Sequence, residues 1–385
     1  MNILRPTSFA RAAFLAAFAT TAMVPFGGAQ ASETLDVAII SFSPYSAWYI
    51  VKEKNLAKDI DLNVRIIEDI TAKNAAITSG TVQCVSNTLD SFVVARSAGV
   101  PLKVVALPDI SYGLDEMVVT EDIKTVNDFA GKSYGADFAF LNHMWMLLSL
   151  KNVGLPYDAV EHRVMLPQDS AAAFVSGGID IDVNYKPFSS QSLQRQGAHV
   201  LKSSLTDRTW ERGLISDAIA CNEQWLVEKP EIAKELIRSW FEAVDWWKQN
   251  PDEGNAIVAK GLDWSESDVR LNQHGAVMLN LNQNMGAFGI EGGNALCKSL
   301  PEGVPQPPEK PSGWGEKLFG GKPDCENGYL ADTWDLFNRI YAEAGVIETP
   351  APSEGSLDRG IVEALAADGV AEKLNTNSWI GRVGL

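Results

Sequence analysis

The chain has 385 residues and a formal net charge of −17 at pH 7, with 49 acidic residues against 32 basic ones. This acidic balance argues against nucleic acid and anionic membrane surfaces as partners, because both would repel it. The length exceeds what one ordinary hydrophobic core supports and indicates two lobes or domains.

The first 31 residues predict a secretory signal peptide rather than part of the fold. Arg5 and Arg11 precede an apolar stretch from Ala12 to Val24. Ala29-Gln30-Ala31 then has the small-residue pattern of a cleavage site. We expect cleavage after Ala31 and a periplasmic mature chain; an uncleaved N-terminal helix is the alternative. No later stretch is long and apolar enough to span a bilayer, so we expect no membrane-embedded part.

From residue 34 onward, strand-like apolar runs alternate with helical patterns, which predicts parallel strands and an α/β fold. A first series over residues 32–113 forms the first part of lobe 1, and a second series over residues 114–214 forms lobe 2. The chain then returns to lobe 1 over residues 215–290, which are strongly helical. Residues 291–385 are predicted to form a Pro/Gly-rich loop and a helical C-terminal extension.

Three helical stretches carry specific expectations. Residues 229–251 predict a helix with Pro230 in its first turn, in which the tryptophans recur at helical spacing and therefore belong to the core. Residues 265–289 predict a continuing helix with Ser265 as a candidate cap. Residues 360–375 predict one further helical stretch.

The four cysteines suggest disulfides, since the expected compartment is oxidising. Cys297 and Cys325 flank a Pro/Gly-rich segment that cannot build its own core, so we expect them to pair and stabilise the fold by about 3–4 kcal/mol. Cys84 and Cys221 lie in strand-like runs. They are equally compatible with a bridge or with two buried thiols.

Catalytic signatures are missing from the sequence. It contains no G-x-S-x-G elbow, and none of the four histidines has a partner at metal-ligand spacing on one helix. We therefore expect a protein that is not an enzyme and that holds no metal and no cofactor.

Polar and aromatic residues collect where predicted strands end, which is the edge of an open α/β sheet where ligands bind. Tyr45 and Trp48 stand at the first of these junctions, although a polar turn there would expose less apolar surface. We therefore expect the two rings to form one wall of a cleft. The junctions are SFSPYS (41–46), SNTLDS (86–91), PDISYGLD (108–115), ADFAFLN (136–142) and NYKPF (184–188).

These stretches, in this order, resemble the periplasmic solute-binding proteins of the nitrate/sulfonate/taurine class of ABC importers. The likeness runs from about Leu35 to about Pro251, and the stretches SNTLD and DISYGLD are most similar to the branch found beside urea- and guanidine-degrading operons. It rests on VAIISFSPYSAWYIVKEKNL, GTVQCVSNTLDSF, ARSAGVPLKVVALPDISYGLDEMVV, DFAGKSYGADF and GGIDIDVNYKPF.

The resemblance implies a type II periplasmic-binding-protein fold: two α/β lobes joined by two crossing segments. Such a protein, expected to be a monomer, closes on a small-molecule solute and delivers it to an ABC permease and its ATPase. Residues 291–324 and the tail after Ile347 depart from the family pattern, which suggests an added cap or a distinct subgroup. The family's ligand loops fall on Ser43, Tyr45, Trp48, Ser86, Asn87, Thr88, Asp109, Ser111, Phe138, Asn142, Trp145, Asn184 and Tyr185, with Asp217 near the crossing between lobes.

The loops favour a cationic or zwitterionic nitrogen compound over a simple anion. They carry hydroxyls but no arginine, and Lys186 is their one strong cation. Asp109, Asp115, Asp137 and Asp217 lie at or beside the expected cleft with several aromatics, a mixture that suits an amine, a guanidine-like solute, an aminosulfonate or an N-heterocycle. Some of these carboxylates, Asp115 above all, are expected to be structural.

Other functions stay open at this point. A nitrate-, sulfonate- or carboxylate-binding protein of the same class is one, and an enzyme of pyrimidine or thiamine-precursor metabolism on the same fold is another. For the enzyme, His143 near Cys84 or Cys221 is the one catalytic combination that the sequence offers. A sensory or adhesive surface protein is the third.

Overall fold

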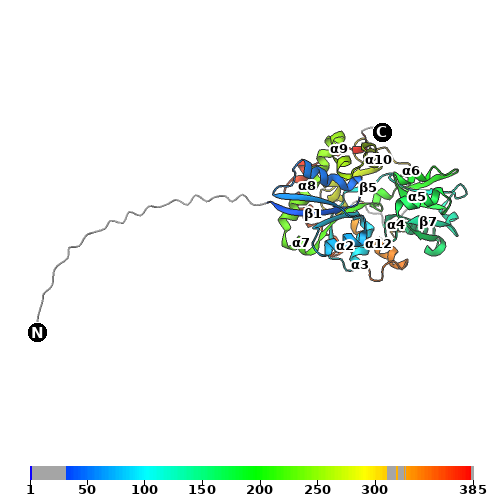
Figure 1. Ribbon diagram of the computed structural model, residues 1–385, viewed down its shortest axis with the longest axis horizontal. Coiled ribbons are helices and arrows are strands. Elements are labelled where there is room, and N and C mark those ends of the chain that lie inside the picture. Colours follow the sequence, from blue (N-terminus) through cyan, green and yellow to red (C-terminus); the bar gives the residue numbers. More distant parts are fainter. Residues whose placement is uncertain (2–31, 310–317, 320–324, 326, 383–385) are drawn as a thin grey trace. The chain divides into compact units, whose positions relative to one another are not determined.

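The computed structural model describes residues 1, 32–309, 318–319, 325 and 327–382. The predicted signal peptide therefore lies outside the described residues, apart from Met1. Ser32–Leu385 form one compact unit, which contains two five-stranded sheets (Figure 1).

The first sheet has the strand order β2-β1-β3-β11-β4. Strand β1 pairs in parallel with β2 and β3, whereas β11 is antiparallel to both β3 and β4. The strands are β1 (Glu33–Ile39), β2 (Ile60–Ile66), β3 (Cys84–Thr88), β4 (Leu102–Ala106) and β11 (Asp217–Asn222), and the helices between them are η1 (Ser43–Ser46), α1 (Ala47–Glu53), α2 (Ile70–Thr78) and α3 (Leu89–Ser97).

The second sheet has the order β10-β6-β9-β7-β8, in which β7 is parallel to β8 and β9 while β6 is antiparallel to β9 and β10. Figure 1 shows β7, α4, α5 and α6 together, at the end of this unit away from β1. The elements are β6 (Asp115–Val119), η2 (Val126–Phe129), β7 (Ser133–Ala136), α4 (Leu141–Val153), η3 (Tyr157–Ala159), β8 (Glu161–Val164), α5 (Pro167–Val175), β9 (Ile181–Tyr185), α6 (Phe188–Ser192) and β10 (His199–Ser203).

The chain crosses between the sheets at residues 107–114 and again at residues 204–216, because β4 and β11 belong to the first sheet and β6 and β10 to the second. The predicted boundaries at residues 113/114 and 214/215 fall within these crossings. The first crossing contains β5 (Asp109–Ser111), and the second contains η4 (Thr209–Arg212). The hydroxyls of Ser111 and Ser204 hydrogen-bond to each other at 2.7 Å and so tie the two crossings together.

The remainder of the described chain, from residue 223 onward, consists of helices, the short strand β12 and connecting loops. Helix α8 has Pro230 at its first position; Trp240 and Trp247 are fully buried and Trp246 packs against the same core, which confirms the expectation for the tryptophans. The helices are α7 (Glu223–Glu228), α8 (Pro230–Gln249), α9 (Pro251–Leu262), α10 (Glu266–Gly275), α11 (Leu281–Ala287), α12 (Leu330–Glu343), α13 (Gly360–Ala367), α14 (Val370–Lys373) and η5 (Ile380–Arg382).

Two helix predictions are wrong in the same way. The continuous helix over residues 265–289 is interrupted after α10, because β12 (Ala276–Met278) pairs antiparallel with β5 and Asn280 caps a new helix. The predicted cap Ser265 does accept a hydrogen bond from the Asp268 backbone. The single stretch over residues 360–375 is divided at Gly369, whose φ of +70° is left-handed and ends the helix.

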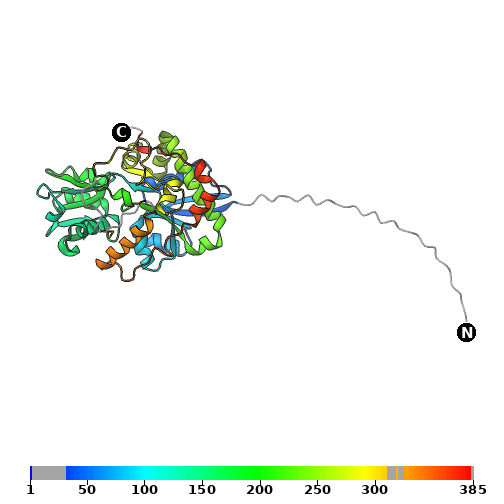
Figure 2. The same ribbon diagram turned by 180° about the vertical axis from the view of Figure 1, so that it is seen from behind.

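Helix α12, from the C-terminal extension, packs against α3 and α4 (Figures 1 and 2). Helix α3 contacts the first sheet and α4 contacts the second. The Tyr341 hydroxyl of α12 donates a 2.5 Å hydrogen bond to the Asp90 carboxylate at the start of α3. Glu343 of the same helix binds Lys151 at 2.6 Å and accepts from the Tyr157 hydroxyl on the second-sheet side. The extension thus contacts both sheet systems.

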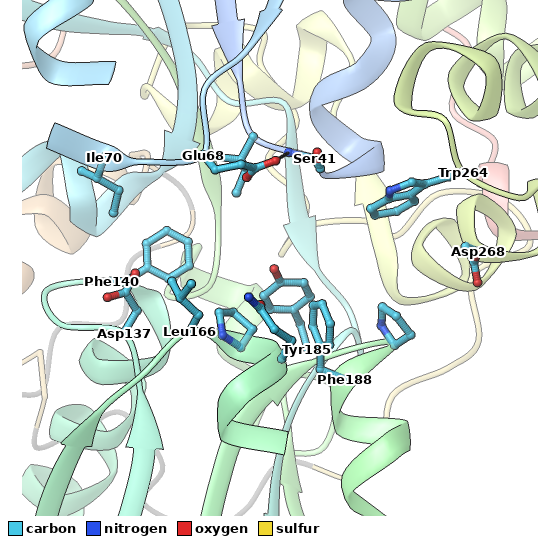
Figure 3. A pocket seen from close by; sticks show the side chains of 14 residues that line it. Ser41, Glu68, Ile70, Asp137, Phe140, Leu166, Tyr185, Phe188, Trp264 and Asp268 are labelled. Carbon is cyan, nitrogen blue, oxygen red and sulfur yellow. Dashed lines mark hydrogen bonds between the residues drawn. The ribbon is translucent and has the colours of Figure 1, made fainter. Parts of the chain in front are cut away.

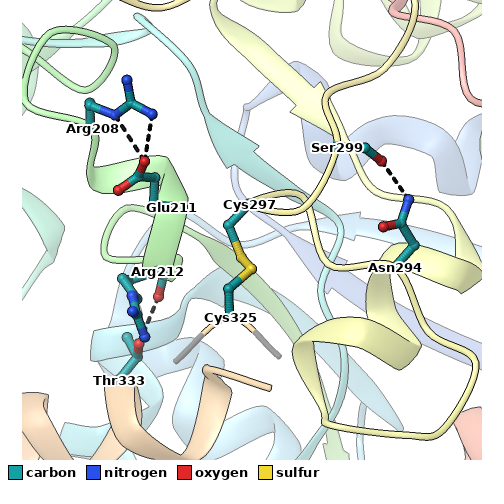
Figure 4. The surroundings of a disulfide bond; sticks show 8 residues. All are labelled: Arg208, Glu211, Arg212, Asn294, Cys297, Ser299, Cys325 and Thr333. Carbon is teal, nitrogen blue, oxygen red and sulfur yellow. Dashed lines mark hydrogen bonds and ion pairs between the residues drawn. A yellow bond between two sulfur atoms is a disulfide. The ribbon is translucent and has the colours of Figure 1, made fainter. Parts of the chain in front are cut away.

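Both pairs of cysteines form disulfides. The Cys297–Cys325 bridge confirms the predicted pair and lies near the bond from the Thr333 hydroxyl to the Arg212 carbonyl (Figure 4). Cys84 and Cys221 form the second bridge and are therefore not the two buried thiols that the sequence also allowed. This bridge joins β3 to β11, whose register also places Thr88 opposite Asp217.

Candidate functional site

A cleft of about 500 Å³ lies between the two sheets. Figure 3 shows Ser41, Glu68 and Ile70 on one side of it, facing Tyr185 and Phe188 on the other. Trp264 and Asp268, from the turn between α9 and α10 and from α10 itself, form one end of the lining. This outer cleft is wide enough for a small organic molecule.

A smaller chamber of about 30 Å³ adjoins the cleft and shares Ile40, Phe140 and Tyr185 with it. Its volume is that of one or two water-sized groups. Apolar walls come from Phe42, Leu114, Leu141 and Ile215, and the polar lining consists of Tyr45, Thr88, Asp109, Ser111, Asp115, Asn142, Tyr185 and Asp217.

The elbow after β1 supplies the aromatic wall of the chamber. Pro44, the second residue of η1, favours this turn, and the Tyr45 ring that follows is 1% exposed. Its hydroxyl donates a 2.6 Å hydrogen bond to Asp217 Oδ1. The Phe42 ring contacts both Tyr45 and Tyr185 edge-on, with centroids 5.0 Å and 5.8 Å apart. The elbow therefore holds its apolar surface against the site and not against solvent.

Three buried carboxyl groups define the electrostatics of the chamber. Burial raises the pKa of Asp115 to about 7 and that of Asp217 to about 6. Burial, and then the neighbouring Asp217, raises the pKa of Asp109 well above its usual range. At neutral pH the cluster therefore keeps at least part of its protons.

Several acceptor atoms in this lining have no hydrogen-bond partner among the residues that the structure describes. They are Asp109 Oδ1, Asn142 Oδ1 and Thr88 Oγ1. Asn142 uses its amide nitrogen on the Val183 carbonyl, so its free oxygen is the atom left for a ligand. Unpaired buried acceptors are costly, and a ligand that brings N–H donors would satisfy them.

Seven of the predicted ligand residues line the chamber: Tyr45, Thr88, Asp109, Ser111, Asn142, Tyr185 and Asp217. The other seven, Ser43, Trp48, Ser86, Asn87, Phe138, Trp145 and Asn184, line neither the chamber nor the outer cleft.

The expectation that Trp48 forms part of the wall is corrected, because its ring is fully buried against Trp240, with centroids 4.7 Å apart. Its indole nitrogen donates to Ser86 Oγ at 3.4 Å, which places Ser86 in the same buried layer. Trp145 points toward the far side of α4, where its indole nitrogen donates to Asp207 at 3.3 Å. Both rings follow the helix face that packs against the core.

The other residues away from the lining have partners or positions of their own. Ser43 accepts from Gln273 at 3.2 Å, and Asn184 donates to the Pro167 carbonyl at 2.8 Å. Phe138 is 49% exposed and lies beside the His143 ring. Asn87 is buried next to Thr88 without facing either cavity.

Lys73 is a buried charge near the site that sequence reasoning missed. It is 1% exposed, and its Nζ donates to the Ser86 carbonyl at 3.3 Å. Burial lowers its pKa to about 7, while Glu68 and Asp217 act in the opposite direction. The available signal was spacing: Lys73 lies four residues before Ile77, the other buried residue of α2.

The one catalytic combination considered from the sequence is excluded by the disulfide. Cys84 and Cys221 are bonded to each other, so neither offers a thiolate to His143. Burial beside His162 lowers the pKa of His143 to about 3.

Lys186, the one strong cation of the predicted ligand loops, already has partners. It donates to the Gly113 carbonyl at 2.8 Å and pairs with Glu116 at 3.2 Å.

Metal-binding clusters and bilayer-spanning helices are both absent from the described ranges. No group of three or more His, Cys, Asp and Glu side chains there is arranged to hold a metal ion. No helix within those ranges has the length and apolar character needed to cross a bilayer.

Two α/β sheet systems, linked by two crossings around a cleft, define the periplasmic-binding-protein fold, and comparison with solved structures confirms it. The aliphatic sulphonate binding protein SsuA of Escherichia coli has a TM-score of 0.53 and 19% identity, over 62% of this chain and 77% of that one. The nitrate-binding protein NrtA of Synechocystis PCC 6803 has a TM-score of 0.57 and 13% identity, over 91% and 92%. The desulfurization enzyme DSZB has a TM-score of 0.51 and 13% identity, over 88% and 99%.

The chain belongs to the family described as NMT1/THI5 like, whose model matches residues 44–254. A relative in Brucella abortus, named as a candidate binding protein, is 28% identical over 167 residues, which is 43% of this chain and 52% of that protein. The chain thus matches about half the length of its curated relatives. The family match confirms the kinship inferred from the sequence.

Proposed function

We propose that this protein is the substrate-binding component of an ABC uptake transporter. It captures a small nitrogen- or sulfur-containing solute between two lobes in the periplasm and delivers it to a membrane permease with its ATPase. The observation that carries the proposal is the buried chamber, which takes residues from both sheets and from both crossings. The family membership and the binding proteins that share the fold support it.

The chemistry of the chamber favours a cationic nitrogen group, such as an amine or a guanidine-like group, over an anion. Its polar lining consists of carboxyl groups, hydroxyls and one amide, and no Arg or Lys side chain from the described residues lines it. Nitrate or a sulfonate would need cationic or N–H donors at this position. An aminosulfonate or an N-heterocycle fits if its nitrogen enters the chamber and the rest occupies the outer cleft.

Capture requires no covalent step. Tyr45, Thr88 and Asp217 approach from the first-sheet side, and Asn142 and Tyr185 from the second. A solute that contacts both sides only when they are close together shifts an open–closed equilibrium toward the closed state. Burial of the solute, which is completed by closure, then stabilises the closed form.

The test is to identify what the protein carries. Mass spectrometry of solute released from protein purified from its native periplasm, followed by a thermal-shift panel of amines, guanidines, sulfonates and carboxylates, should give a nitrogen cation or zwitterion. Calorimetric titration should show binding without turnover. A chemically changed product after incubation would replace the proposal with an enzyme, and exclusive binding of nitrate or a plain sulfonate would reverse the ligand class.

A further inference from the structure

Asp109 lies in the first crossing and Asp217 at the start of β11, next to the antiparallel bridge between Ile110 and Ser216, and both carboxyl groups line the chamber. Two carboxyl groups buried in one small chamber do not readily ionise together, and if one keeps its proton it can donate a hydrogen bond to the other. Asp217 Oδ1 also accepts the Tyr45 hydroxyl at 2.6 Å. Asp109 Oδ1, on a side chain 1% exposed, has no partner among the described residues.

We propose that Asp109 and Asp217 share one proton in the ligand-free protein and that a captured cationic nitrogen group displaces this proton into solvent. The inference rests on the proposed function and adds the charge balance of the site. One positive charge enters the chamber as the proton leaves, so the net charge buried between the sheets stays the same. The site therefore buries no additional uncompensated charge, either in the ligand-free protein or in the complex.

The surroundings support one held proton rather than two ionised carboxylates. Each group lies in a fully buried site, and a second negative charge this close would be strongly unfavourable. Burial raises the pKa of Asp217, whereas the hydrogen bond from Tyr45 and the charge of Lys73 lower it and so favour one negative charge on the pair. The titratable groups nearest the pair are Tyr45, Asp115, Tyr185 and Lys73; Glu68 acts on Lys73 and Tyr185, and Glu116 and Lys186 act on Asp115.

The exchange has a definite sign with pH. When binding releases a proton, affinity for a cation rises with pH below the pKa of the pair and levels off above it. Burial and the neighbouring Asp217 raise the pKa of Asp109 well above its usual range, so affinity for a cation should still be rising at neutral pH, by at most about tenfold per pH unit for one proton. A neutral ligand would show little dependence, and an anion the opposite slope.

The decisive experiment is isothermal titration calorimetry at about pH 6 in buffers of different ionisation enthalpy, which counts protons released per ligand bound. The probes are guanidinium, ethylammonium, taurine and nitrate. We expect guanidinium or ethylammonium to bind with release of close to one proton. The Asp109→Asn variant should bind more weakly, release almost none and lose the pH slope. Asp61→Asn, which removes an exposed carboxylate of β2 that lines neither the chamber nor the outer cleft, is the matched control and should behave as wild type.

A ligand-independent measurement separates this inference from the proposed function. Infrared difference spectra of wild type against Asp109→Asn and Asp217→Asn, near pH 6, should show the carbonyl stretch of a protonated carboxyl that both variants lack. If that band is absent, the inference is wrong whatever the protein binds. If the band is present and persists when a cation binds, the displacement is wrong. If it is present but only nitrate binds, the cation preference is wrong, and with it the displacement.

Discussion

The inner chamber and the outer cleft are adjacent but differ in almost every physical respect. The chamber holds about 30 Å³, is lined by three buried carboxyl groups and leaves acceptor atoms unpaired, whereas the cleft holds about 500 Å³ and is bordered by aromatic, apolar and partly exposed side chains. Electrostatic interactions are strong in the first and screened in the second. The difference indicates that the chamber selects the charge of the ligand and the cleft selects its size and shape.

The largest expected effect comes from removing the disulfide below the chamber. The Cys84→Ala/Cys221→Ala double variant removes the disulfide that joins β3 to β11, the two strands that carry Thr88 and Asp217. The two cysteines are 137 residues apart in sequence. On the chain-entropy model the free energy of unfolding should fall by about 5 kcal/mol, measured by urea denaturation. Cys297→Ala/Cys325→Ala is the control: its link spans 28 residues and should cost about 3–4 kcal/mol. An equal or larger loss in the control would contradict the ranking.

Next in size is loss of the chamber's charge. Asp217→Asn removes a carboxylate that the cation would face and should weaken cation binding by about 2–5 kcal/mol, measured by calorimetry at pH 8. Asp268→Asn in the outer cleft removes a carboxylate at a partly exposed position and should change affinity by less than about 1 kcal/mol. Similar losses of affinity in both variants would contradict the inference that the chamber selects the charge of the ligand and the cleft its size and shape.

Although Asp217→Asn should weaken cation binding, it should stabilise the ligand-free fold. The folded-state pKa of Asp217 lies above its ordinary value, so its contribution to stability is full below about pH 4 and is lost as pH rises through about 6. Asparagine does not ionise, so Asp217→Asn should be more stable than wild type by about 1–3 kcal/mol at pH 8 and nearly equal to it at pH 4. Urea denaturation at the two pH values checks this, and a variant less stable at pH 8 would oppose it.

The smallest expected effect lies in the cleft. Trp264→Ala removes an aromatic face that borders the outer cleft, and should weaken binding of a cation with an organic body by about 0.5–1 kcal/mol, or a few-fold. The pH dependence of binding should stay unchanged, because the chamber is intact. A changed pH slope would show that the cleft participates in the proton exchange.

Sequence reasoning predicted the chamber better than it predicted the cleft. Polar residues at strand ends converge wherever neighbouring strands do, and this rule pointed to the stretches that contain Tyr45, Asp109 and Asn142, whereas Asp217 followed from the family resemblance. The cleft depends on which side of a turn or helix faces the opening. Trp264 and Glu68 were therefore missed, Phe188 was named only as the end of the stretch NYKPF, and Trp48 was placed on a wall although it belongs to the core.

The alternation of strand and helix patterns, the Pro230 helix and the chemistry of the strand ends follow from local sequence, because each depends on residues close together in the chain. Tertiary structure alone decided that β12 pairs with β5, that Cys84 meets Cys221, that Lys73 is buried and that Asp109 and Asp217 line one chamber. Each of these facts depends on the register between distant segments, and no local pattern encodes that register.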